Sequence, residues 1–219
     1  WFMVKATLAK EKIEGSLQDV TEKVKANDRL HFLAEHDPLT GILNRRGIEK
    51  EFDEAVAMLG DGVSMSLAYL DLDRFKLIND LFGHLAGDEV LKQVCERVRN
   101  MLTEGQSMGR VGGDEFVIVF KGTPIDSAAW VCRGIVDRIG NLPYQIGDRA
   151  FQVKGSIGLM EISESIRVED AISVADRACR EAKSGNHGNP VIYDRHSPVF
   201  REREDELRLI ARFGTNVAP

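Results

Sequence analysis

Hydrophobic and polar positions change rhythm several times along the 219 residues. Apolar residues recur every three or four positions over 48–59, 88–102, 126–139 and 168–183, which predicts four amphipathic helices. We expect Asp88 and Asp126 to open the second and the third of them. Shorter apolar runs at 64–70, 117–120, 151–160 and 191–193 are typical of strands. Helices and strands therefore alternate along most of the chain.

The first 36 residues carry a different pattern. Residues 6–36 contain no Pro and a single Gly, and their apolar positions follow spacings of four and three, as in a heptad seam. These positions are Ile13, Leu17, Val20 and Val24. We expect residues 1–34 to form an N-terminal helical part, and the helix should stop at Asp37 at the latest, because Pro38 disfavours α geometry in the residue before it. Two interpretations remain open: a parallel helix pair that passes a signal from upstream, and a solvated helix packed on its own domain.

Two glycines and two acids precede the run at 117–120. Gly112 and Gly113 predict a tight hairpin turn in which glycine takes positive φ values, and Asp114 and Glu115 then begin the next strand. Acids at the rim of a sheet, beside backbone without side chains, suit a metal ion bound to phosphate. The simpler alternative is a hairpin with ordinary polar turn residues.

The strand at 64–70 also ends on acids, since Asp71-Leu72-Asp73 follows it directly. Chemistry in α/β sheets usually gathers at the carboxyl ends of strands. An EF-hand calcium loop is excluded, because that loop needs Gly at position 76 and Glu at position 82, where this chain has Lys76 and Phe82.

Composition and charge narrow the class of protein. Charged residues make up 29% and hydrophobic residues 43%, as in a globular domain, and the net charge of -6 argues against a nucleic-acid binder. Cys95, Cys132 and Cys179 fit no zinc pattern or closed disulfide set, so we expect reduced core residues in a cytosolic compartment. No apolar stretch is long enough to span a membrane, although Trp1-Phe2-Met3-Val4 fits the end of an upstream membrane helix as well as a truncated fragment.

The motifs, taken in order, resemble those of the GGDEF family, the diguanylate cyclases. The resemblance covers about residues 35–195 and rests on five motifs. They are Asp37-Pro38-Leu39-Thr40-Gly41-Ile42-Leu43-Asn44-Arg45-Arg46, Asp71 to Asp80, Phe82-Gly83-His84 with Gly87-Asp88, Gly112-Gly113-Asp114-Glu115-Phe116, and Gly155-Ser156-Ile157-Gly158.

The resemblance implies a fold and an activity. The fold would be α/β (α+β), a central, mostly antiparallel five-stranded sheet flanked by helices and related to the palm of nucleotide cyclases and polymerases. The activity would be the joining of two GTP molecules into cyclic di-GMP with release of two pyrophosphates. Each domain would carry one GTP, so a homodimer is expected, and the cofactor would be Mg²⁺, with Mn²⁺ as the alternative ion.

The resemblance also assigns site residues. It gives Asp71, Asp114 and the backbone carbonyl of Leu72 as metal ligands, and Asp114, then Glu115, as the groups that ease deprotonation of the attacking hydroxyl. Guanine would be read by Asn79 and Asp88, which favours GTP over ATP. Lys76 would act in catalysis by offsetting charge on the transferring phosphate. The remaining positions would lie near the nucleotide and its phosphates: Phe75, His84, Gly112, Gly113 and Lys183.

Two departures from the family pattern affect function. Members usually grip the terminal phosphates with a Lys and an Arg; Lys183 matches the Lys, but His187 stands at the Arg position, so we expect weaker GTP binding or reduced activity. Many members also carry Arg-x-x-Asp before the signature as an inhibitory product-binding site. Thr103 and Gln106 stand there, so we expect no inhibition through that site.

The sequence thus predicts three parts: an N-terminal helix at 1–34, a GGDEF domain at 35–196 and a linker helix at 197–219. The last resembles the helix that leads to an EAL phosphodiesterase domain. A rival hypothesis follows, in which the chain is a catalytically weak GTP-binding module that regulates an attached EAL domain; a pure dimerisation module is a third. We expect a cytoplasmic domain, with an upstream sensor or inner-membrane segment in the full-length protein as an open alternative.

Overall fold

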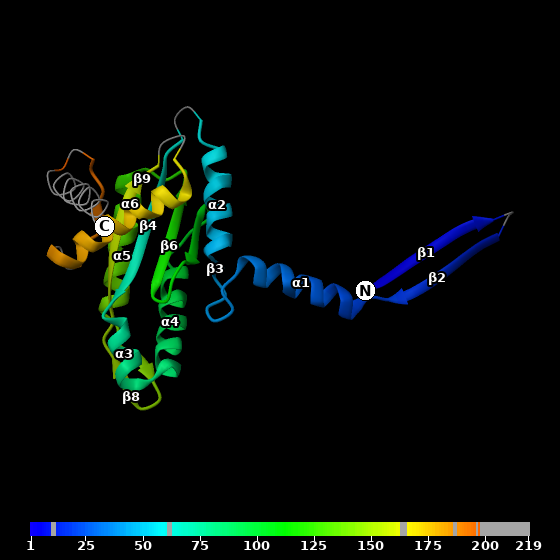
Figure 1. Cartoon of the computed structure of the whole chain (residues 1–219), viewed down its shortest axis with the longest axis horizontal. Coiled ribbons are helices and arrows are strands. Elements are labelled where there is room, and N and C mark those ends of the chain that lie inside the picture. The colour runs from blue at the N-terminus through cyan, green and yellow to red at the C-terminus, as the bar shows by residue number, and fades with distance from the viewer. Residues whose placement is uncertain (10–11, 61–62, 163–165, 186–187, 196, 198–219) are drawn as a thin grey trace, which may run out of the picture.

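The computed structural model of the chain describes residues 1–9, 12–60, 63–162, 166–185, 188–195 and 197 (Figure 1). Its centre is a six-stranded sheet with strand order β10-β9-β4-β6-β5-β3. The strands are β3 (Leu43–Asn44), β4 (Met65–Asp73), β5 (Gln106–Arg110), β6 (Glu115–Lys121), β9 (Lys154–Glu161) and β10 (Val191–Ile192). The four long strands pair antiparallel, and the two edge strands pair parallel.

The predicted α/β architecture is confirmed, but the sheet has six strands where five were expected. The additional strand is β3, which lies at the edge beside β5. Its two residues are too few to carry a period-two pattern, so the hydrophobic pattern could not reveal it.

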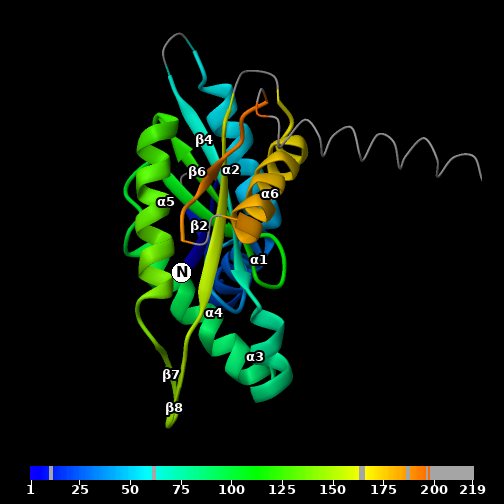
Figure 2. The ribbon, with the colours of Figure 1, turned by 90° about the vertical axis from the view of Figure 1, so that its left-hand side faces the viewer.

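Helices cover both faces of the sheet (Figure 2). One face is covered by α4 (His84–Arg99) and α5 (Ile125–Gly140), and the other by α2 (Arg45–Ala57) and α6 (Val168–Gly185). The short helix α3 (Phe75–Phe82) follows β4 at its carboxyl end, and a small hairpin of β7 (Tyr144–Ile146) and β8 (Arg149–Phe151) precedes β9. Since both faces are covered, the central strands are apolar almost without interruption.

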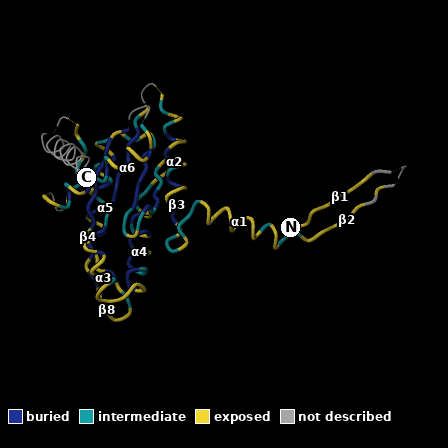
Figure 3. The backbone as a smooth tube through the Cα atoms, viewed as in Figure 1, coloured by how far each residue is buried: buried dark blue, intermediate teal, exposed yellow. Residues whose placement is uncertain are grey.

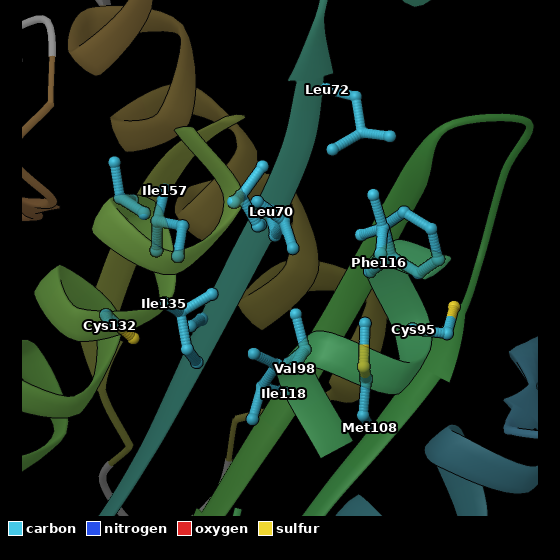
Figure 4. Close-up of a cluster of buried hydrophobic side chains, with 14 of the residues drawn as sticks. Leu70, Leu72, Cys95, Val98, Met108, Phe116, Ile118, Cys132, Ile135 and Ile157 are labelled. Carbon is cyan, nitrogen blue, oxygen red and sulfur yellow. The ribbon is translucent and has the colours of Figure 1, made fainter. Parts of the chain in front are cut away.

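The core consists of two apolar layers, one on each side of the sheet. Figure 4 shows part of the layer under α4 and α5, where Leu70, Ile118 and Ile157 of three adjacent strands meet Val98 and Ile135 of the helices. All five side chains are buried. The three cysteines are free and buried, as the sequence predicts. The core therefore holds the sheet rigidly, and with it the strand ends that carry the acids.

The predicted first residues of the helices agree with the structure only in part. The predicted cap of α2 is confirmed, since the Asn44 side chain accepts a hydrogen bond from the backbone N–H of Gly47 at 2.9 Å. The predictions that Asp88 and Asp126 open helices are wrong, because α4 begins at His84 and α5 at Ile125. Gly83, at a φ of 84°, makes the break between α3 and α4, so Asp88 lies inside the helix and is available for another role.

Gly158 brings α6 into direct contact with the sheet. A Cβ atom at this position would lie 2.1 Å from the backbone nitrogen of Cys179 and 2.2 Å from the carbonyl oxygen of Ala175. Only glycine fits such an approach of helix backbone to strand. The position of α6 is therefore set by contact between main chains.

The prediction that residues 1–34 form a helix is wrong for the first half of this segment. Residues Phe2–Ala9 and Lys12–Asp19 form an antiparallel hairpin, β1 and β2, and the helix α1 covers only Thr21–Glu35. The spacing of four between Ile13 and Leu17 fits a strand as well as a helix, because it is also a multiple of two. The pairing Val4↔Leu17 puts apolar residues of both strands on one face, and this alternation was the signal that sequence analysis missed.

The β1–β2 hairpin and helix α1 project from the domain (Figure 1), and their described residues are largely exposed (Figure 3). Helix α1 has no buried residue. The predicted helix at 197–219 lies outside the described residues except for Ser197, and His187 lies outside them as well. Across the part of the chain that the structure describes, no helix combines the length and the apolar character needed to cross a membrane.

Candidate active site

The acids predicted from two separate motifs meet at one end of the sheet. Strands β4 and β6 pair so that Asp71 lies directly across from Glu115. The backbone N–H of Leu72 donates to the carbonyl oxygen of Asp114 at 3.2 Å, which brings the turn before β6 against the end of β4. The sequence prediction that these acids converge is thus matched by the pairing of the strands.

The turn that carries Asp114 has a different geometry from the predicted one. Gly112 and Gly113 do not adopt positive φ, so that expectation is wrong. A Cβ at Gly112 would lie 1.9 Å from a carboxylate oxygen of Glu115, whereas one at Gly113 would meet no atom within 4 Å. Gly112 therefore leaves space for Glu115, and Gly113 leaves its backbone open to an approaching ligand.

Lys183 supplies a positive charge to the acids. It lies in the last turn of α6, and its Nζ is 2.6 Å from Oδ1 of Asp71. Burial acts to lower the pKa of Lys183, but the hydrogen bond and the negative charge of Asp71 raise it overall. The side chain stays protonated and is suitably placed to bind an anionic group above β4.

The two aspartates are less acidic than usual. Burial is the main cause that raises the pKa of Asp71, and the charges of Asp114 and Glu115 add to it against the opposing effect of Lys183. Burial and the charge of Glu115 likewise raise the pKa of Asp114. Carboxylates that repel one another in a partly buried place would be stabilised by a divalent cation.

Two residues to which the sequence assigned no role contact acids at this end of the sheet. Tyr69 lies two residues before Asp71, on the same face of β4; burial and a hydrogen bond to Glu115 raise the pKa of its hydroxyl. Ser156 of β9 donates its hydroxyl to Oδ1 of Asp73 at 3.0 Å. Period-two alternation along β4 could have identified Tyr69, but the partner of Ser156 depends on the register between strands.

A third residue, Arg110, fixes the turn itself. Its Nε and Nη2 atoms donate to the carbonyl oxygen of Gly113 at 3.0 and 2.7 Å, and its Nη1 lies 3.3 Å from both carboxylate oxygens of Asp37. Arg45 adds a bond from Nη2 to the carbonyl oxygen of Val111 at 2.9 Å. The motif at 37–46 thus packs against the turn that carries Asp114. The two segments are far apart in sequence, so the sequence alone does not reveal this contact.

The residues expected to read guanine lie where α3 and α4 meet. A Cβ at Gly87 would be 2.0 Å from Oδ1 of Asn79, so the Asn79 side chain lies against the α4 backbone one residue before Asp88. Lys76 and His84 are exposed on the same pair of helices. Phe75 is 5% exposed and belongs to the core, so only its main chain at the start of α3 is available to a ligand.

The donor set fits a hard cation. Two carboxylates, of Asp71 and Asp114, and the carbonyl of Leu72 are oxygen ligands, which Mg²⁺ prefers together with water and phosphate oxygens. Among the residues that the structure describes, no three His, Cys, Asp or Glu side chains form a metal cluster by themselves. A metal held by this set would therefore complete its coordination with a bound substrate.

Comparisons with known proteins show the family to which this chain is related. A family model described as "Diguanylate cyclase, GGDEF domain" matches residues 34–189. The probable diguanylate cyclase DgcE of Escherichia coli (strain K12) is 31% identical over 180 residues, which are 81% of this chain and 16% of that protein. The cyclic di-GMP phosphodiesterase PdeR of the same strain is 34% identical over 186 residues, 84% of this chain and 27% of that protein. The chain thus spans about a quarter or less of the length of these relatives.

A solved structure supports the fold. The crystal structure of the coiled coil and GGDEF domain of DgcB from Caulobacter crescentus, in complex with c-di-GMP, superposes with a TM-score of 0.73. The match covers 80% of this chain and 93% of that chain at 24% sequence identity. At this level of identity, the likeness concerns the arrangement of helices and strands.

Proposed function

The chain belongs to the GGDEF family of diguanylate cyclases, and we propose that it condenses two molecules of GTP into cyclic di-GMP and two pyrophosphates with Mg²⁺ as the cofactor. The observation that supports this most is the cross-strand pair of Asp71 and Glu115, with Asp114 beside it and Lys183 bound to Asp71. Acids that can hold a cation and a lysine that can hold a phosphate are the groups that this reaction needs.

The proposed reaction assigns a task to each group. The 3′-hydroxyl oxygen of one GTP bonds to the α-phosphorus of the other, the bond from that phosphorus to the oxygen bridging the α- and β-phosphates breaks, and pyrophosphate leaves. A second step of the same kind, in which the two nucleotides exchange roles, closes the ring and releases the second pyrophosphate. Asp114, assisted by Glu115, eases removal of the hydroxyl proton. A bound Mg²⁺ would neutralise the phosphates and polarise the α-phosphate. Lys183 stabilises the charge that develops on the leaving pyrophosphate.

Substrate choice rests on α3 and α4. A carboxylate at Asp88 accepts hydrogen bonds from the N1–H and the exocyclic amine of guanine, and adenine offers neither pattern. Asn79 lies against the backbone next to it. We therefore propose GTP rather than ATP as the substrate.

The test is direct. Purified protein is incubated with GTP and Mg²⁺, and cyclic di-GMP is measured by chromatography. Asp114→Asn should lower the rate of product formation on the order of 100-fold or more, because one metal carboxylate is lost. Asp126→Asn, which neutralises an exposed acid in the first turn of α5, should leave the rate unchanged.

A stability measurement separates loss of chemistry from loss of fold. Burial and the charge of Glu115 raise the pKa of Asp114, so the ionised carboxylate destabilises the folded protein at neutral pH. Asp114→Asn should therefore raise the Tm in metal-free buffer while it lowers the rate of product formation. A lower Tm together with lower activity would indicate damage to the fold instead.

A regulatory function is the second candidate, and it is favoured by the similarity to PdeR and by His187. The similar protein PdeR is named a phosphodiesterase, and His187 stands at the usual position of an arginine. In this alternative, the chain binds GTP and regulates an attached EAL domain while it makes little product. Tight binding of GTP by the purified chain without formation of cyclic di-GMP would favour it.

A further inference from the structure

A cavity of about 690 Å³ lies beside the paired acids. Lys183, the residue bound to Asp71, forms part of its wall, so the cavity is linked to the proposed metal site through this lysine. The other lining residues come from the β4–α3 junction and from the start of β9: Asp73, Arg74, Leu77, Ile78, Gln152 and Lys154. Three of the lining residues are cationic and one is anionic, which favours a polyanionic occupant.

The β-sheet register places Lys154 on the same face as the acids. Lys154 is the first residue of β9 and pairs with Asp73 of β4, two positions along from the pair Ser156↔Asp71. Side chains two residues apart on a strand share a face, and the hydrogen bond from Ser156 to Asp73 confirms that this face is common to both strands. The lysine therefore lies on the face that bears Asp71, about 7 Å farther along the strand.

Lys154 is available to a ligand. Its side chain is exposed, and among the described residues the structure gives it no ion-pair partner, whereas Lys183 is bound to Asp71. A lysine ammonium is a mobile point charge that commonly binds phosphate. Lys154 lies about 7 Å along β9 from Ser156, the residue across from Asp71, and a triphosphate chain is long enough to extend over such a distance.

We propose that Lys154 binds the terminal phosphates of the nucleotide and, after reaction, the departing pyrophosphate. The inference rests on the proposed function, since it takes GTP as the ligand of this site. Lys183 then holds the phosphate nearer to Asp71, and Lys154 holds the far end of the chain from the opposite strand. Both lysines act on the β- and γ-phosphates, so neither contributes to the binding of a nucleoside monophosphate.

The experiment compares ligands that differ only in their phosphates. Equilibrium binding of GMP, and of a GTP analogue with a methylene bridge between the α- and β-phosphates, is measured in Mg²⁺ by calorimetry. The analogue cannot release pyrophosphate, so turnover does not disturb the measurement. Lys154→Ala should weaken binding of the analogue about tenfold and leave GMP binding unchanged, while Lys154→Arg keeps most of the affinity.

A matched control is Lys92→Ala, which removes an exposed lysine of α4 that pairs with Glu89. It should change neither affinity. Pyrophosphate alone should also bind more weakly to Lys154→Ala, and the Tm of that variant should equal that of the unsubstituted protein because the side chain is exposed.

The outcomes separate the two proposals. If the unsubstituted protein binds the analogue and Lys154→Ala binds it equally well, the role of Lys154 is wrong and the cyclase proposal stands. An equal loss of GMP and analogue binding would also contradict it, because that result indicates a structural role. If the unsubstituted protein binds no analogue and makes no cyclic di-GMP, the proposed function fails, and the role of Lys154 fails with it.

Discussion

At the scale of single residues, Arg110 connects two motifs that are far apart in sequence. It donates to the carbonyl oxygen of Gly113 in the turn beside Asp114, and it forms an ion pair with Asp37 at the end of the segment that follows α1. Both side chains of the pair are 16% exposed. The position of Asp114, a proposed metal ligand, thus depends on a residue at the junction with the N-terminal helix.

The Asp37–Arg110 pair leads to a prediction on stability. Burial acts to raise the pKa of Asp37, but hydrogen bonds from Thr40 and the charge of Arg110 lower it overall. A lowered pKa in the folded state means that the ionised carboxylate stabilises the protein above the unfolded-state pKa of about 4, and that this contribution is lost as the pH falls through the folded-state value. Asp37→Asn should cost about 2 kcal/mol in the free energy of unfolding at pH 7.

Urea unfolding between pH 7 and pH 3 measures this effect. The difference in stability between Asp37→Asn and the unsubstituted protein should shrink as the pH falls below about 4. Asp126→Asn serves as the control, because its carboxylate is exposed in the first turn of α5. A difference that stays constant over the whole pH range would mean that the charge of Asp37 is not what stabilises the junction.

Residues 103 and 106 give a second prediction at this scale. The backbone N–H of Thr103 donates to the side-chain oxygen of Gln106 at 3.0 Å, so the amide serves the local turn. Neither side chain carries the charge needed to bind a dinucleotide phosphate and guanine. Added cyclic di-GMP should therefore leave the initial rate unchanged at micromolar concentrations.

The matched experiment installs the family motif. The double variant T103R/Q106D should become inhibited by its product, while T103A/Q106A should behave like the unsubstituted protein. Strong inhibition of the unsubstituted protein that disappears in T103A/Q106A would contradict the prediction.

At the scale of elements, the hairpin β1–β2 and helix α1 form a unit apart from the domain. The carboxylate of Asp19, at the end of β2, accepts a hydrogen bond from the backbone N–H of Thr21 at 2.9 Å, so the hairpin leads into the helix without a free loop. Phe2, Val4 and Leu17 are all more than 60% exposed on this unit. Apolar side chains at such exposure are typical of surfaces that another chain or domain covers.

The exposed face of α1 leads to a prediction on dimerisation. Leu30 is 68% exposed, so a substitution there leaves the core of the domain intact. If two copies pair through this helix, Leu30→Glu places two negative charges in the contact and should weaken dimerisation about tenfold or more. The rate of cyclic di-GMP formation should fall with it, because in the proposed reaction each of two domains would supply one GTP.

Sedimentation analysis across a range of protein concentrations tests this. Lys25→Glu, which changes the charge of a neighbouring exposed position, is the control and should have a smaller effect. Equal masses for the Leu30→Glu and unsubstituted proteins at all concentrations would show that α1 does not mediate pairing. The dimer would then have to form through another surface.

At the scale of the whole molecule, the sequence predicted the elements whose pattern has a single interpretation. Strands β4, β6 and β9 and helix α6 are long, and their periods are unambiguous. The hairpin at 2–19 was mistaken for a helix because a spacing of four fits both periods. Partners such as Tyr69 and Glu115 depend on strand register, which no local pattern reveals.

The family motifs identified more of the candidate site residues than the hydrophobic periodicity did. They identified Asp71, Asp114 and Lys183, which the fold brings to one end of the sheet. Backbone geometry was harder to foresee: the positive φ expected at Gly112 and Gly113 is absent, whereas Arg74, which is not glycine, has a φ of 58° just before α3. A non-glycine residue keeps such a φ only where the surrounding structure fixes it, and this could not be foreseen from the local sequence.

The contact at Gly158 has a consequence for how nucleotide affinity can change. Because α6 rests on β9 main chain to main chain, any methyl group at this position would push the helix outward and carry Lys183 away from Asp71. If Lys183 binds the nucleotide as proposed, a substitution at Gly158 would thereby lower the affinity for GTP without removing any phosphate contact. The absence of a side chain at Gly158 therefore determines how far Lys183 on α6 lies from Lys154 on β9.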